Sequence, residues 1–93
     1  MKMLPFKQRR ISPERVIRTF SQETPSEEFK WHRDAEDREI TPLTETDWML
    51  QIDNELPKPI SGTMKIPAGV YHRVIKGSGN LNLEVAMIPR MEQ

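Results

Sequence analysis

The feature that most constrains the fold is an alternation of side chains near the carboxyl end of the chain. Every second residue of this stretch is large and apolar: Leu81, Leu83, Val85 and Met87. Successive side chains of a strand point to opposite faces, so this spacing places the four on one face. We therefore predict a strand over residues 81–88 with an apolar face.

The same period of two recurs in short segments upstream. Phe29 and Trp31, for example, alternate with charged or polar residues. The further predicted strands are 28–34, 38–43, 48–52, 63–66 and 71–75. Pro42 favours an edge or a bulge for the second of these. The segment Lys76-Gly-Ser-Gly-Asn80 gives the strongest hairpin signal. Several short strands separated by turn signals predict an all-β sandwich or barrel.

The first 27 residues have a different pattern. Ser12-Pro13-Glu14 is typical of a helix start, because serine caps free N–H groups, proline tolerates the first helical position and glutamate suits the positive end. Val16, Ile17 and Phe20 follow at helical spacing. We predict a short helix over residues 13–21 and divide the chain into a basic N-terminal arm (1–27) and a β-barrel (28–93).

Composition limits the classes of protein. With 93 residues, 35% of them hydrophobic, and no cysteine, the chain predicts one small domain with a modest core and no disulfide. We expect a homodimer, another partner or a bound ion to supplement such a core. No apolar run approaches a membrane span, and the first residues lack the apolar region of a signal peptide. We expect a cytoplasmic protein with no membrane partner.

The net charge of zero conceals a gradient. Residues 1–20 sum to +5, residues 21–47 to −6 and the remainder to +1. A basic arm can contact an acidic protein surface or nucleic acid, or it can be a solvated face that docks on its own domain. Nucleic acid is not the expected partner, because the domain as a whole is not basic.

Two histidines and one aspartate carry the clearest chemical signal. His32 and Asp34, two residues apart on a predicted strand, point to the same side. His72, from a later strand, can join them if that side faces the interior. Two histidines and a carboxylate hold a metal on one face and leave other positions open. The sequence predicts one divalent ion here (Fe, Mn, Ni or Zn), against the alternative of structural histidines and a solvated turn.

The Pro-x-Gly-x-x-His motif that ends at His72 resembles the second conserved motif of cupins, which carries their last metal-binding histidine. The wider segment resembles small single-domain cupin-like proteins of phage and bacterial type, over about two thirds of the chain. The stretches most similar to that group are Trp31–Asp34, Trp48–Pro57 and Tyr71–Gly77. The resemblance implies a small cupin-like jelly-roll barrel with His32, Asp34 and His72 as metal ligands.

The chain departs from the cupin pattern around the first motif. Asp34 stands where cupins have a second histidine, and no glycine occurs between Glu39 and Trp48. If Glu45 takes the glycine position, the cupin glutamate position falls on Arg38, which cannot bind a metal. If the spacing is counted forward from Asp34, Glu39 takes that position. Both alignments stay open.

The order His32, Asp34, His72 also resembles that of iron-dependent oxygenases that use 2-oxoglutarate, on a related jelly roll. Those enzymes are far longer. The arginine expected about ten residues after the last histidine is missing, because Arg90 lies eighteen residues after His72. We keep this version as a narrower alternative.

Two functions of different classes follow. The first is a metal-binding cupin whose barrel mouth binds a small polar or anionic molecule. Arg38 or Arg73 would orient that ligand, and Trp48 or Tyr71 would wall the pocket, unless the arginines pair locally and the tryptophan belongs to the core or rim. The second is a non-catalytic, phage-type interaction module that docks on a protein partner through residues 1–27. Catalysis is undecided, because no nucleophile with a base stands out.

Overall fold

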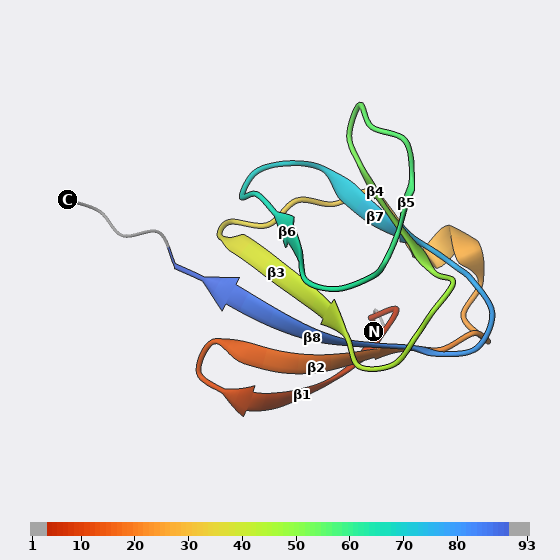
Figure 1. The fold of residues 1–93 in the computed structure, drawn as a ribbon, viewed down its shortest axis with the longest axis horizontal. Coiled ribbons are helices and arrows are strands. Elements are labelled where there is room, and N and C mark those ends of the chain that lie inside the picture. The colour runs from red at the N-terminus through yellow and green to blue at the C-terminus, as the bar shows by residue number, and fades with distance from the viewer. Residues whose placement is uncertain (1–3, 90–93) are drawn as a thin grey trace.

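The computed structural model describes residues 4–89 (Figure 1). Their elements, in chain order, are β1 (Lys7–Ser12), β2 (Arg15–Phe20), the 3-10 turn η1 (Ser26–Glu28), β3 (Asp37–Pro42), β4 (Met49–Ile52), β5 (Lys58–Pro59), β6 (Met64–Ile66), β7 (His72–Ile75) and β8 (Leu81–Ile88). Within these residues there is no helix of a length and apolarity that could cross a membrane.

The strands form two antiparallel sheets. One has five strands in the order β1-β2-β8-β3-β6, and the other has three in the order β5-β4-β7. In Figure 1 the smaller sheet lies to one side of the larger one, and the interior lies between them. This arrangement confirms the predicted all-β, jelly-roll fold. The described strands do not close it into a barrel, since no named strand of one sheet pairs with one of the other.

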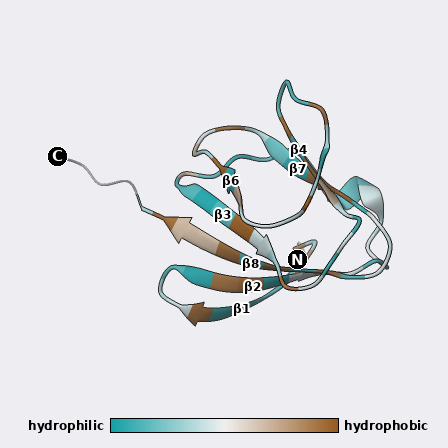
Figure 2. Ribbon diagram, in the orientation of Figure 1, coloured by the Kyte–Doolittle hydropathy of each residue, from teal (hydrophilic) through white to brown (hydrophobic). Residues whose placement is uncertain are grey.

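The alternating segment near the carboxyl end is β8, at the centre of the larger sheet. It pairs with β2 on one side and β3 on the other, which satisfies its backbone along both edges. Leu81, Leu83 and Val85 are 1–2% exposed. Figure 2 shows apolar residues gathered along β2 and β8. The strand predicted from alternation is therefore confirmed, with its apolar face in the core.

The predicted helix over residues 13–21 is wrong, because this segment contains β2. Pro13 lies in the tight connection from β1, and β2 pairs with β8 over its whole length. Val16 and Phe20 are buried, whereas Ile17 is on the opposite face and half-exposed. Helical spacing and strand alternation both place residues 16 and 20 together, so the local pattern was ambiguous. Two features favour the strand: the segment pairs with β8, and it is rich in β-branched residues. The basic segment 7–20 is thus part of the larger sheet.

The predicted strand over residues 28–34 is also wrong in its extent. Its only β pairing is an isolated bridge between His32 and His72. Phe29 is 6% exposed and packs on Trp48 with ring centroids 5.4 Å apart, while Trp31 is 41% exposed. Because Phe29 is buried in the aromatic core, residues 28–34 do not run alongside β7, and the pairing with β7 is confined to His32.

Candidate metal centre

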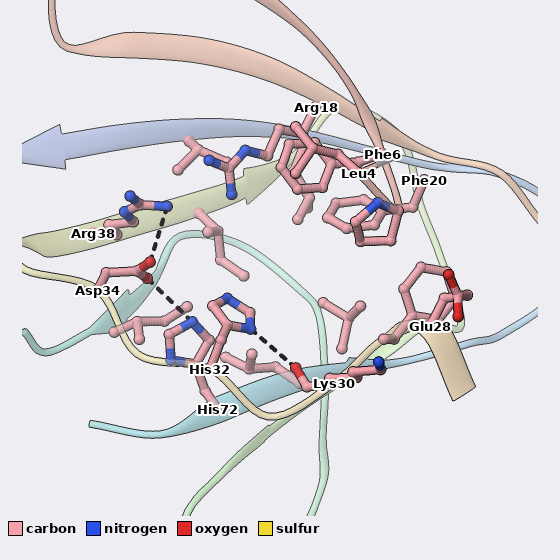
Figure 3. A pocket seen from close by; sticks show the side chains of 18 residues that line it. Leu4, Phe6, Arg18, Phe20, Glu28, Lys30, His32, Asp34, Arg38 and His72 are labelled. Carbon is pink, nitrogen blue, oxygen red and sulfur yellow. Dashed lines mark hydrogen bonds and ion pairs between the residues drawn. The ribbon is translucent and has the colours of Figure 1, made fainter. Parts of the chain in front are cut away.

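A cavity of about 440 Å³ lies between the two sheets. Most of its wall is apolar. Glu28 lies at one end, whereas five polar side chains lie toward the other (Figure 3). The polar residues at that end are Arg18, His32, Asp34, Arg38 and His72. The volume falls within the range of about 300–1,000 Å³ that is usual for small-molecule sites.

The two histidines are held opposite each other by the backbone. The N–H of His32 donates to the carbonyl of His72 (3.0 Å), and the N–H of His72 donates back to the carbonyl of His32 (2.9 Å). Their rings lie with centroids 4.3 Å apart. The bridge therefore places both imidazoles side by side at the cavity, although the pairing between these two segments does not continue beyond it.

Two contacts between arginines and aromatic rings flank this bridge. The guanidinium of Arg73 lies 4.7 Å from the centre of the Trp31 ring, and that of Arg33 lies 5.2 Å from the centre of the Tyr71 ring. Each such contact contributes about 0.5–1 kcal/mol at an exposed site. Because side chains alternate, these residues point away from the cavity while the histidines point into it. The contacts brace the bridge where the ladder is missing.

Three of the predicted ligand-binding residues do not line this cavity. Tyr71 is 44% exposed and faces outward. Arg73 donates from Nε and Nη2 to Oε1 of Gln51, at 3.0 and 2.9 Å. Trp48 is fully buried in the core, where its indole N–H donates to the carbonyl of Gly79 (3.0 Å). For Trp48, the core position weighed as the alternative is the one observed.

Asp34 reaches the histidines from the same segment as His32. Its side chain is 11% exposed, and its Oδ2 lies 3.3 Å from Nε2 of His72. The potential ligand atoms of His32, Asp34 and His72 all lie within 4.8 Å of one another. The structure therefore brings together the three residues predicted from the sequence. His32 and Asp34 both face the cavity, as expected for residues two apart in an extended segment.

The hydrogen bonds of the imidazoles determine which nitrogens face the cavity. Nδ1 of His32 lies 3.1 Å from the carbonyl oxygen of Lys30, and Nδ1 of His72 lies 2.9 Å from that of Val70. A carbonyl oxygen only accepts, so both Nδ1 atoms carry the proton and each neutral ring has its lone pair on Nε2. Metal-binding histidines commonly have their second nitrogen held in this way.

The charge state of His72 suits a metal ligand. Burial lowers its pKa, and the charges of His32 and Arg38 lower it further, against opposite effects of the Val70 carbonyl and Asp34. In the neutral form, which the lowered pKa favours, Nε2 presents a lone pair to Oδ2 of Asp34, 3.3 Å away, and that buried oxygen accepts no hydrogen bond from the described residues. Two acceptor atoms that face each other without a donor leave a place for a cation. The donor set thus fits a metal ion.

The cupin-like turn before β7 is fixed to this site. Gly69 has φ +76°, a backbone region that favours glycine, and its N–H donates to the carbonyl of Asp34 (2.8 Å). The N–H of Ala68 donates to Oδ1 of Asp37 (2.8 Å). The turn therefore positions Asp34 as well as leading into His72.

Arg38, rather than Glu39, occupies the inward position on β3. Arg38 lines the cavity, and Glu39, the next residue of the strand, points to the other face. Arg38 donates to Oε1 of Glu36 from Nε (3.1 Å) and Nη2 (2.8 Å), and its Nη1 lies 3.4 Å from Oδ1 of Asp34. In the alignment that puts the cupin glutamate position at residue 38, a cation stands in place of a metal ligand. That cation pairs with Glu36 and Asp34.

Arg18 is a charged residue at the polar end of this cavity that sequence reasoning missed. On β2 it shares the inward face with Val16 and Phe20, so recognition of the strand was the signal that could have found it. Burial lowers its pKa to about 10, and the charge of Arg38 adds to this effect, while Asp34 and Glu36 oppose it. The cavity therefore holds a cation that its surroundings compensate only in part.

Comparison with known proteins identifies the fold. No protein-family model and no curated protein matches the chain. A cupin domain from Bordetella pertussis Tohama I matches with a TM-score of 0.62 and 22% identity, over 96% of this chain and 99% of that one. Hydroxypropylphosphonic acid epoxidase from S. wedmorenis matches with a TM-score of 0.60 and 21% identity, over 80% of this chain and 42% of that one. The chain thus spans less than half of the epoxidase.

A cobalt(II) form of HppE in complex with Tris buffer matches with a TM-score of 0.67 and 17% identity, over 95% of this chain and 56% of that one. At identities this low the likeness shows the fold alone, and that fold is cupin-like. The expected phage type has no support among these neighbours.

Proposed function

We propose that this cupin-like protein binds one divalent metal ion through His32, Asp34 and His72, and a small polar or anionic molecule in the adjoining cavity. The observation that carries the proposal is the convergence of three ligand atoms within 4.8 Å. Within the described part of the chain, one of them, Oδ2 of Asp34, is buried and accepts no hydrogen bond.

The ligand types favour a transition metal. Two imidazoles and one carboxylate suit iron(II), manganese(II), nickel(II) or zinc(II), and such a set leaves positions for water or a ligand on the open side. All three residues line the cavity, so we place this open side toward it. The names of two structural neighbours, iron(II) HppE and cobalt(II) HppE, agree with an ion of this group. A bound ion would polarise a ligand as a Lewis acid.

Elemental analysis of the untagged protein as purified tests the metal site. We expect about one transition-metal ion per chain in the wild type. We expect none in a His32→Ala/His72→Ala double variant and a clear loss in Asp34→Asn. Asp53→Asn, at an exposed turn carboxylate, is the matched control and should keep the metal.

Two results would contradict the proposal. If the wild type contains no metal and takes up none after refeeding with iron(II), manganese(II), nickel(II) and zinc(II), the histidines are structural. If Asp34→Asn binds metal as tightly as the wild type, the carboxylate is not a ligand. Thermal unfolding of each variant shows whether a loss of metal reflects a loss of fold.

The second candidate is a non-catalytic module that docks on a protein partner through its basic N-terminal segment. β1 exposes basic side chains, including Arg9 and Arg10, which would suit an acidic partner, and it is an edge strand of the larger sheet, where a second copy could pair in a homodimer. This candidate expects β1 and β2 to be ordered only in a complex. Slow hydrogen exchange of β2 amides in dilute monomer would count against it, and light scattering would test the dimer.

A further inference from the structure

The cavity contains an arginine pair beyond the proposed metal ligands. Arg18 extends from β2 and Arg38 from β3, two strands that are separated by β8 in the larger sheet. Figure 3 shows both side chains reaching over the sheet toward the same end of the cavity, beside Asp34. Two cations from different strands thus face one shared space.

Arg18 has hydrogen-bonding capacity to spare. Its Nε donates to Oε1 of Gln8 (2.7 Å), and its guanidinium carbon lies 4.2 Å from the centre of the Phe6 ring. Within residues 4–89 its two terminal nitrogens have no hydrogen-bond partner. Those nitrogens form the part of the guanidinium that can bind a carboxylate or phosphonate with two parallel hydrogen bonds.

The charge balance of the cavity favours an anion. Its lining contains three cationic side chains, Arg18, Lys30 and Arg38, and two carboxylates, Glu28 and Asp34. Glu36, which pairs with Arg38 from just outside this lining, brings the sum to zero, so a divalent ion at the metal centre would leave an excess of positive charge. Burial is the main cause of the lowered pKa of Arg18, and the charge of Arg38 adds to it, so an anion beside Arg18 would favour its charged form.

The rest of the cavity wall favours a ligand whose anionic group is attached to an apolar body. Phe6, Phe20 and Phe29 line the cavity on the side away from Asp34, as Figure 3 shows for the first two. Leu50 and Val74 add aliphatic surface from the smaller sheet. An ion with an apolar body would satisfy both parts of the wall, whereas a strongly polar body would lose hydration without gaining partners.

We propose that Arg18 binds the oxyanionic head group of a small amphiphilic ligand through its terminal nitrogens, with the charge of Arg38 beside it, and that the apolar body of the ligand lies against Phe6, Phe20 and Phe29. The head group then lies next to the metal centre. This inference deepens the proposed function and rests on it for the role of the ligand, but binding of the anion can be measured with or without metal.

Calorimetric titration of the full chain at low salt tests the pair. The probes are pentanoate, pentylphosphonate and the neutral pentanamide, each added to metal-free and zinc-treated protein. We expect at least one anion to bind, and pentanamide to bind about tenfold more weakly or worse, since a charged hydrogen bond is lost. The tighter anion identifies the head group as a carboxylate or a phosphonate.

The variants separate this subsite from the metal centre. Arg18→Gln should weaken anion binding about tenfold or more while the metal content stays at the wild-type level. Arg9→Gln, on the exposed edge strand β1, is the matched control and should change nothing. If Arg18→Gln proves unfolded by circular dichroism, Arg18→Lys keeps the charge but loses the fork, and should still weaken binding.

Three results would overturn the inference: no binding of either anion by the wild type, equal affinity for pentanoate and pentanamide, or unchanged anion affinity in folded Arg18→Gln and Arg18→Lys. Failure of the metal centre looks different. Anion binding that depends on Arg18 in a protein without any metal affinity would keep the subsite and reject the metal site.

Discussion

At the scale of single residues, the two tryptophans show how burial separates similar side chains. Trp48 is fully buried among Phe20, Phe29 and core aliphatic residues, and its N–H is bonded to the carbonyl of Gly79. Trp31 is 41% exposed and contacts Arg73 on the outer surface. Trp48 packs at the centre of the core, whereas Trp31 stabilises the His32–His72 bridge from the outer surface.

Replacement of these tryptophans should therefore have unequal effects. We expect Trp48→Ala to lower the free energy of unfolding by about 3–5 kcal/mol, because it leaves a large cavity. This is a large part of the stability of a small domain. Trp31→Ala should cost about 0.5–1 kcal/mol, the value of an exposed contact with an arginine. Chemical denaturation measures both, and equal losses would contradict the assignment.

A carboxylate outside the cavity gives a pH-dependent prediction. Hydrogen bonds from the Oγ–H and the N–H of Ser78 hold the pKa of Asp47 below its ordinary value of 3.8. A lowered pKa means that these bonds stabilise the fold above the unfolded-state pKa and that this contribution is lost as the pH falls through the folded-state pKa. Ser78→Ala should raise the pKa of Asp47, as followed by carboxyl NMR titration. An unchanged pKa would assign the shift to the backbone alone.

At the scale of elements, β2 is the strand that changes the interpretation of the N-terminal segment. A strand separates Val16 from Ile17 by placing them on opposite faces, whereas a helix would put both near the core. Val16 is 1% exposed in the interior, and Ile17 lies on the outer face opposite Arg9. This alternation also turns Arg18 inward, and so the strand builds part of the cavity.

Alanine substitutions can distinguish the two arrangements in solution. We expect Val16→Ala to cost about 2 kcal/mol of unfolding free energy, because a buried side chain loses two carbons. Ile17→Ala should cost less, although it removes more atoms, because that side chain is half-exposed. Urea unfolding of both variants checks the order. A larger loss for Ile17→Ala would favour the helix.

At the scale of the whole molecule, a small core is combined with a cavity of about 440 Å³. A ligand-binding cavity between the sheets is not filled by packed side chains, so this part of the interior adds little to the stability of the fold. The two sheets pack through the aromatic core, and the isolated bridge joins β7 of the smaller sheet to the segment that precedes β3. A metal ion held by Asp34 and the two histidines would join residues on both sides of this bridge.

Metal should therefore stabilise the whole fold. An ion that binds only the folded state adds about 2.7 kcal/mol when its free concentration is a hundred times the Kd. For a domain of this size that corresponds to an increase in Tm of about 10 °C or more. Calorimetry with the favoured metal and then with excess chelator measures this change. The His32→Ala/His72→Ala variant should show no change, and an equal increase in that variant would indicate binding elsewhere.

The sequence by itself determined the features that depend on neighbouring residues. Alternation predicted β8 and its buried face, and the His-x-Asp spacing predicted that His32 and Asp34 point to the same side, while His72 was added by the resemblance of the turn motif to cupins. These inferences succeeded because side-chain direction along an extended chain follows from local geometry. The inward position of Arg38 was one of two alternatives that local spacing left open.

Only the tertiary structure decided the features that depend on distant partners. Val16 and Phe20 fit both a helix and a strand, and pairing with β8, more than sixty residues away in the sequence, selected the strand. The same pairing brought Arg18 into the cavity. Trp48 and Tyr71 were both candidates for the cavity wall, yet one went to the core and the other to the surface. Which face of a strand meets which sheet is decided by long-range packing, and one sequence does not encode that choice locally.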